Sequence, residues 1–317
     1  MEVEQFFNTV RLLLVVGKGG VGKTSVAATV ARVAAGHGRS VLLADVDGKH
    51  GAAMAFGISG LSYDEQVLLP ADRASGRAEI RGRTLTADDA LVEYLSDHGM
   101  GRLARKLASN GVVDVIATAT PGIRDLVVLG KVKQLVTENR HDLVILDTPA
   151  SGHAVTFLRS ASALAESVGS GRIRRQAEEV LSILGDHDRC RVLLVTLAEE
   201  TPVNETIETA FTLEDSIGVA LAPVVINALL DIPPGVPVGA LARLDPAERA
   251  AVGHALAVER ARAVAQHAQV ERLSAGLPLP HIVLPERVGV GLDAVDYAAL
   301  AAAFVASLAT TNVSVGS

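Results

Sequence analysis

One short segment limits what this chain can fold into more than any other. Residues 17–24 read Gly-Lys-Gly-Gly-Val-Gly-Lys-Thr and match G-x-x-x-x-G-K-[ST], between an apolar run over 12–16 and a helical pattern that follows Lys23. The glycines leave room for phosphate oxygens beside the backbone, and successive N–H groups can point at them from the positive end of the helix. The segment therefore predicts a loop that binds the phosphates of a nucleotide.

Individual roles follow from the chemistry of this loop. We expect the Lys23 ammonium to neutralise the β and γ phosphates and the Thr24 hydroxyl to be a ligand of Mg²⁺. The other residues of the expected nucleotide site lie in or next to the loop: Gly17, Gly19, Gly20, Val21, Gly22 and Ser25. ATP with Mg²⁺ is therefore the cofactor pair that the segment predicts.

Carboxylates end two of the apolar runs. The run over 143–146 is followed by Asp147, and an aspartate there in a fold with this loop holds the metal, usually through water. The run that begins at Val41 leads into Asp45 and Asp47, which suit one metal contact and one group that orients or deprotonates the attacking water. We expect Thr24, Asp147 and one carboxylate of this pair, which we assign as Asp45, to hold the metal, and which of Asp45 and Asp47 positions the water stays open.

A second interpretation of the loop is a dinucleotide site. Gly17, Gly19 and Gly22 also satisfy G-x-G-x-x-G, and Asp45 follows further along the chain at a strand end. This pattern would indicate a nicotinamide or flavin oxidoreductase. It leaves Lys23, Thr24 and Asp147 without a role, so we favour the triphosphate.

The fold class follows from short, continuous apolar runs, which are typical of parallel strands covered on both faces. They lie at 12–16, 41–44, 143–146, 192–195, 224–226 and 282–284, with helical patterns between them. We predict an α/β fold with a mostly parallel central sheet flanked by helices, forming a single domain over 1–317 with helical additions at about 61–111 and 161–185. Asp245, Pro246 and Glu248 predict a capped helix start.

Composition narrows the class of partner and the compartment. The net charge of −7 argues against a broad nucleic-acid surface. The single cysteine, Cys190, can form neither an internal disulfide nor a zinc cluster, which fits a reducing interior. The acidic amino terminus is unlike a secretory signal and the apolar runs are too short to span a membrane, so we expect a cytoplasmic protein.

An additional lysine, Lys18, makes the loop a deviant Walker A motif, and with it the chain resembles the ArsA-type ATPases of the larger MinD/ParA class. This group includes arsenite-pump and tail-anchored-protein-targeting ATPases. The resemblance covers most of 11–305. Asp147-Thr148-Pro149 with Gly152-His153 resembles its switch II, the segment ending in Asn227 resembles its adenine-contacting strand, and 280–288, with Pro285, resembles its carboxy-terminal loop.

The resemblance implies a P-loop NTPase fold and Mg²⁺-dependent ATP hydrolysis in a nucleotide-controlled dimer. In that family pattern Lys18 reaches across the dimer interface to the partner's nucleotide, Asp47 positions the hydrolytic water and Asn227 contacts adenine. The implied partners are a second copy or a paralogous subunit, together with a protein client or a membrane protein. A MinD/ParA-like positioning ATPase is the alternative, and the client stays open.

The sequence also departs from the family. There is no Cys-x-x-Cys pair for the zinc seam of the eukaryotic targeting members and no cysteine cluster for arsenite, because only Cys190 is present. Methionine occurs only at 1, 54 and 100, so no Met-rich client groove is evident. The one nucleotide-binding loop fits single-module bacterial members best.

Overall fold

A nine-stranded sheet forms the centre of the computed structural model, which describes residues 3–46, 51–97, 99, 122–232, 244–289 and 291–310. The order is β3-β4-β2-β5-β1-β6-β8-β9, with β7 beside β6, and all pairs are parallel except β3 with β4. The strands are β1 (Leu12–Val16), β2 (Val41–Val46), β3 (Gln66–Leu69), β4 (Ile80–Leu85), β5 (Leu143–Asp147), β6 (Cys190–Leu197), β7 (Ala220–Leu221), β8 (Val224–Leu229) and β9 (His281–Pro285). All six predicted strands are confirmed.

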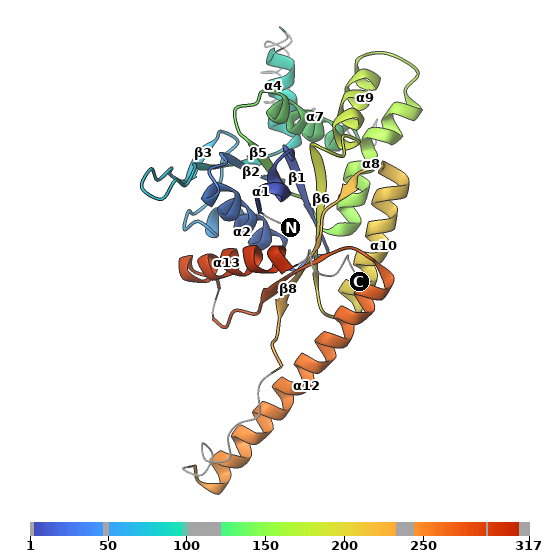
Figure 1. Ribbon diagram of the computed structural model, residues 1–317. Coiled ribbons are helices and arrows are strands. Elements are labelled where there is room, and N and C mark those ends of the chain that lie inside the picture. Colours follow the sequence, from blue (N-terminus) through green and yellow to red (C-terminus); the bar gives the residue numbers. More distant parts are fainter. Residues whose placement is uncertain are drawn as a thin grey trace.

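Helices cover both faces of the sheet (Figure 1). They are α1 (Val3–Phe7), α2 (Lys23–Gly36), α3 (Gly51–Met54), α4 (Ala87–Asp97), α7 (Ile123–Thr137), α8 (Ser151–Ser167), α9 (Arg172–Leu184), α10 (Glu200–Ile217), α12 (Pro246–Gly276) and α13 (Ala294–Thr310). The α1, α2 and α13 helices pack on one face, and α7, α8, α9 and α10 pack on the other. The predicted α/β class is thereby confirmed.

Strand β1 shows why the apolar runs are continuous. All of its residues are buried, and alternate side chains enter different cores. Leu12 and Leu14 point into the core beneath α7, α8 and α10, whereas Leu13 and Val15 point into the core beneath α2 and α13. A strand buried on both faces needs an apolar residue at every position.

Two helix ends follow the expected capping rules. The α2 helix ends at Gly36, and Gly38 then adopts a left-handed φ of +77°. At the start of α12 the Asp245 carboxylate accepts hydrogen bonds from the backbone N–H groups of Ala247 and Glu248, and the Glu248 carboxylate accepts one from the N–H of Asp245.

The helical addition expected over 61–111 is wrong in its first part. Residues 66–69 and 80–85 form β3 and β4, α4 follows at 87–97, and 98 and 100–111 lie outside the described residues. Strand β4 escaped the sequence analysis because Arg81, Gly82 and Arg83 interrupt its apolar pattern. The addition expected over 161–185 is helical, formed by the end of α8 and by α9.

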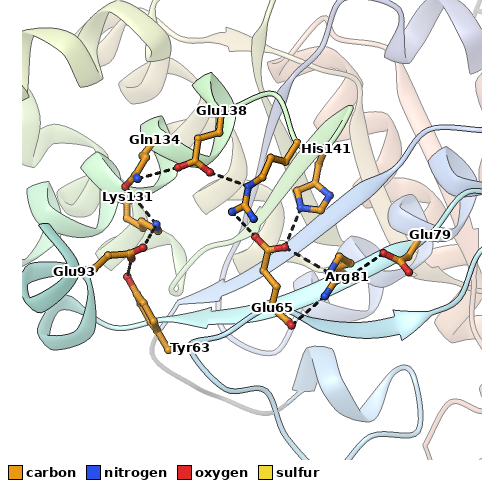
Figure 2. Close-up of polar contacts among 10 residues, drawn as sticks. Tyr63, Glu65, Glu79, Arg81, Glu93, Lys131, Gln134, Glu138 and His141 are labelled. Carbon is orange, nitrogen blue, oxygen red and sulfur yellow. Dashed lines mark hydrogen bonds and ion pairs between the residues drawn. The ribbon is translucent and has the colours of Figure 1, made fainter. Parts of the chain in front are cut away.

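A polar network explains how a strand with two arginines fits into the sheet (Figure 2). The Glu65 carboxylate contacts Arg81, Arg140 at 3.0 Å and His141 at 3.1 Å. Nearby, the Arg83 guanidinium lies 4.3 Å from the centre of the Tyr63 ring. Because these charges are paired or stacked, β4 can carry arginines next to a buried sheet.

Figure 2 also shows the same network reaching α4 and α7. The Lys131 ammonium of α7, whose side chain is 4% exposed, donates to Glu93 of α4 at 2.7 Å, and Glu93 accepts a second hydrogen bond from Tyr63. Although burial raises the pKa of Glu93, the hydrogen bonds from Lys131 and Tyr63 leave it below its ordinary value. The carboxylate is therefore charged at neutral pH and pairs with Lys131.

Across the described residues, no helix is both long and apolar enough to cross a bilayer.

Candidate functional site

The glycine-rich loop joins β1 to α2 in a conformation that requires glycine. Gly20 and Gly22 have φ values of +87° and +88°, a region that other residues rarely adopt. A Cβ atom on Gly22 would overlap the Asn227 amide nitrogen, and one on Gly17 would overlap the Val195 carbonyl oxygen. The Lys23 ammonium donates a hydrogen bond to the Lys18 carbonyl at 3.1 Å, so it lies across the loop.

The two acidic strand ends meet beside the loop. Asp45 and Asp147 occupy paired positions on the neighbouring parallel strands β2 and β5, and they are only 2% and 7% exposed. The Thr24 hydroxyl, in the first turn of α2, donates to the Asp147 carboxylate at 2.5 Å. The structure therefore brings together the three residues that the sequence predicts as metal ligands.

This arrangement fits a small divalent cation. Buried carboxylates are unfavourable unless a cation or hydrogen-bond donors compensate their charge. A hydroxyl and two carboxylates are oxygen donors of the kind that Mg²⁺ prefers, in a site where it usually keeps several waters and binds phosphates. Thr24, Asp45 and Asp147 could hold Mg²⁺ here, next to a loop that could hold the phosphates.

Residues far apart in the chain complete the surroundings of the loop. The Asn227 side chain, from β8, donates to the Val21 carbonyl at 2.9 Å although the two residues are 206 positions apart. Pro285, at the end of β9, lies opposite Leu229, just beyond Asn227 on β8. Asn227 is thus in contact with the loop, whereas Pro285 lies one strand further along the sheet.

The segment that follows Asp147 also packs against the loop. The Thr148 hydroxyl donates to the Val15 carbonyl at 2.7 Å, and the Ala150 Cβ atom lies within van der Waals range of the position that a Cβ on Gly19 would take. Helix α8 begins at Ser151, directly afterwards. The segment 148–150 therefore lies between the loop and the start of α8.

The predicted catalytic residue Asp47 lies outside the described residues, as do residues 48–50. The residues on either side of 47–50 lie beside the predicted metal ligands. Val46 ends β2 directly after Asp45, and Gly51 lies beside the Thr24 side chain.

The loop lysine has a partner that the sequence analysis missed. The Lys18 ammonium lies 2.6 Å from the Glu205 carboxylate of α10, and both side chains are more than one third exposed. Glu205 follows Glu199 and Glu200 at the start of a helix, where acidic residues are common for electrostatic reasons, so its sequence position carried no signal of this contact.

Comparisons with known proteins agree with this geometry. Residues 10–177 match the sequence profile of the anion-transporting ATPase (ArsA) family. The chain is 34% identical to ATPase BagA of Mycobacterium tuberculosis over 206 residues, and this aligned region covers 63% of this chain and 59% of that protein. It is 27% identical to a putative arsenical pump-driving ATPase of Halobacterium salinarum, covering 69% of this chain and 36% of the relative.

A plant relative extends the comparison. ATPase GET3C of Arabidopsis thaliana is 27% identical over 161 residues, covering 48% of this chain and 41% of that protein. The chain thus spans less than two thirds of the length of each of these relatives. Because the family profile covers more than half of the chain and the sheet, loop and acidic strand ends agree with it, the chain belongs to the ArsA family of anion-transporting ATPases and has the P-loop NTPase fold.

Proposed function

We propose that this protein hydrolyses ATP with Mg²⁺ and that hydrolysis drives a nucleotide-controlled switch between two subunits. The observation that supports this most directly is the contact between the Thr24 hydroxyl and the Asp147 carboxylate, beside Asp45 and next to the loop. Mg²⁺ bound there would supply positive charge and a template for the β and γ phosphates.

Other residues of the chain are proposed to bind the phosphates, the attacking water and the adenine. The backbone N–H groups at the start of α2 would bind phosphate oxygens, and the Lys23 ammonium would leave the Lys18 carbonyl for the β and γ phosphates. Asp47 is our proposal for the group that orients the attacking water. Asn227, already in contact with Val21, is our proposal for the adenine contact.

Lys18 is proposed to act on the nucleotide of the partner subunit. Its pairing with Glu205 is exposed, and exposed ion pairs contribute only about 0–1 kcal/mol. The ammonium can therefore exchange Glu205 for a phosphate at little cost. A cation delivered in this way stabilises the charge that develops on the transferred phosphoryl group, as an arginine finger does.

The test uses two inactive variants that fail for different reasons. Lys23→Ala should lose nucleotide binding, whereas Lys18→Ala should bind ATP and lose turnover, by about 10³-fold if the lysine does the work of an arginine finger. Mixing the two variants should restore part of the activity. The site of the Lys18→Ala subunit would bind ATP and receive Lys18 from its neighbour. If the mixture remains as inactive as its components, the lysine does not act across the interface.

A matched control variant distinguishes the effect of losing the Lys18–Glu205 ion pair from the effect of losing Lys18 itself. Glu205→Gln removes the charge that holds Lys18 but leaves Lys18 in place, so it should keep or raise turnover. A loss of turnover in Glu205→Gln as large as that in Lys18→Ala would contradict the exchange. In that case the pair itself would be needed for activity.

A cavity suggests where a protein client could bind. About 840 Å³ of space lies between α4, α7 and α9, with the paired Lys131 on its wall. Its apolar lining includes Ala90, Leu91, Tyr94, Ile123, Leu126 and Val127. We propose that apolar side chains of a client helix enter this cavity, because its size suits a few such side chains and its apolar wall would gain from being covered.

A synthetic leucine-rich helical peptide, fluorescently labelled, tests the client proposal. Its binding should be stronger with a non-hydrolysable ATP analogue than with ADP, and Leu91→Glu should weaken it. Val67→Glu, an exposed position on β3, is the control and should leave it unchanged. If Leu91→Glu binds the peptide as tightly as the unaltered protein does, this cavity is not the client site. If the peptide binds equally with the ATP analogue and with ADP, client binding is not coupled to the nucleotide state.

A further inference from the structure

Within the described chain, the amino-terminal half of α12 has side-chain hydrogen bonds only at its own start, where Arg249 donates to the Leu244 carbonyl at 3.1 Å and Glu248 accepts from the Asp245 N–H. We call residues 246–261 the arm. In Figure 1 this part of α12 extends well beyond the sheet and the other helices. Every side-chain hydrogen bond or ion pair recorded between α12 and the body involves Arg262 or a later residue, such as Gln266, whose side chain accepts from the Leu230 N–H at 2.8 Å.

Apolar side chains are nevertheless present on the arm. Val252 is 37% exposed and Val258 is 49% exposed, and Ala263 and Leu273 are the buried residues of α12 in the described structure. A surface helix normally places its apolar side chains against a core, and exposed valines contribute nothing to stability there. Val264, in the half of α12 that packs on the body, is 51% exposed, so exposure alone does not distinguish the arm, and the position of its apolar residues on the helix has to be considered.

The arm continues the stripe by which α12 packs on the body. Ala263, Gln266, Val270 and Leu273 recur at intervals of three and four residues and face the rest of the chain. Counted backwards at the same spacing, this stripe passes through Glu259, Leu256, Val252 and Arg249. The apolar centre of the arm thus has an arginine at one end and a glutamate at the other.

This charge pattern is complementary to itself in one orientation. If two arms lie antiparallel with Val252 opposite Leu256 of a second copy, then Arg249 lies opposite Glu259 of that copy, twice by symmetry. Glu248 and Arg262, which flank the stripe, also come opposite each other. In a parallel pair Arg249 would face Arg249 and Glu259 would face Glu259, which is repulsive.

We propose that the arm is a dimerisation element that pairs antiparallel with the arm of a second copy of this chain. Gly253 and Ala255, next to the two-fold axis, allow the helices to approach closely. Without nucleotide, when the proposed contact at the nucleotide sites is not formed, an isologous pair of this kind closes on itself and gives a dimer rather than a filament. The contact is separate from the nucleotide site, so it forms without nucleotide and does not depend on the proposed role of Lys18.

The first test measures the dimer by sedimentation velocity without nucleotide. Val252→Glu should abolish the dimer, whereas Val258→Glu, the same change on the outer side of the arm, should not. Arg249→Glu should raise the dissociation constant about tenfold, because it turns two attractive pairs into repulsive ones. Arg249→Glu combined with Glu259→Arg should restore affinity to within about twofold, since the pairs are then reversed but attractive.

The second test fixes the orientation. Ala255→Cys places a thiol next to the two-fold axis, and it should form an intermolecular disulfide under mild oxidation. His254→Cys, on the outer side, should not. The native Cys190 is buried and does not interfere. A monomer at all accessible concentrations, or a dimer insensitive to Val252→Glu, would overturn the proposal; a dimer in which the double charge reversal fails to restore affinity would overturn the antiparallel arrangement.

Discussion

Replacing Gly22 by alanine tests the account of the nucleotide loop most sharply, because the chain supplies its own control. Gly20 and Gly22 have φ values of +87° and +88°, so alanine is strained by the same amount at either position. No atom lies within 4 Å of a Cβ placed on Gly20, whereas a Cβ on Gly22 would overlap the Asn227 amide. The difference between the two variants isolates the contact with Asn227.

The expected magnitudes follow from these surroundings. Gly20→Ala should cost roughly 1–2 kcal/mol of folding free energy for the left-handed conformation, partly offset by the lower entropy of the unfolded chain. Gly22→Ala should cost roughly 1–3 kcal/mol more. The Asn227 side chain must move, and its hydrogen bond to the Val21 carbonyl is lost.

Urea unfolding without nucleotide, followed by circular dichroism, measures both variants. Asn227→Ala should cost about 1 kcal/mol alone, and in its presence Gly22→Ala should cost no more than Gly20→Ala does. If Gly20→Ala and Gly22→Ala destabilise the protein equally, to within about 0.5 kcal/mol, the contact between Asn227 and the loop is not as described.

Three further predictions concern the core and the pH dependence. Phe304→Ala should lower the free energy of unfolding by about 3–5 kcal/mol in urea titrations, because Phe304 is fully buried against Phe6. Burial raises the pKa of the Cys190 thiol to about 12, so a thiol reagent should label the native protein only as it unfolds, and rapid labelling in native buffer would refute this. Burial lowers the pKa of His281 in the folded state, so as pH falls below the ordinary value of 6.5 the unfolded chain binds a proton that the folded protein does not, and stability is lost. His281→Gln should therefore flatten the decline of the urea midpoint between about pH 8 and about pH 5.5.

Much of the sheet could be predicted because a strand buried on both faces leaves a continuous apolar run. Strands β1, β2, β5, β6, β8 and β9 all have such runs. Strand β4 could not be found in this way, because Arg81 and Arg83 occupy it and their charges are accommodated by Glu65 and Tyr63 from the segment before β3. Pairing of a buried charge with a distant residue has no local sequence signal.

The same contrast holds at the site. Parallel strands end at the same edge of a sheet, so the meeting of Asp45 and Asp147 beside the loop followed from the pattern once both were placed at strand ends. Asn227 was expected near the nucleotide only through the family resemblance. Nothing in the loop sequence indicates which strand will supply its neighbour.

The sequence by itself determined the phosphate-binding loop, the strands with continuous apolar runs and the acidic strand ends, because each depends on residues that are close along the chain. The tertiary structure alone decided that Lys18 pairs with Glu205, that Asn227 supports the loop, and that half of α12 extends away from the rest of the described residues. These features depend on where elements far apart in the sequence come to lie. The local pattern of α12 is that of an ordinary helix, and only the packing around it shows which part of its surface is left uncovered.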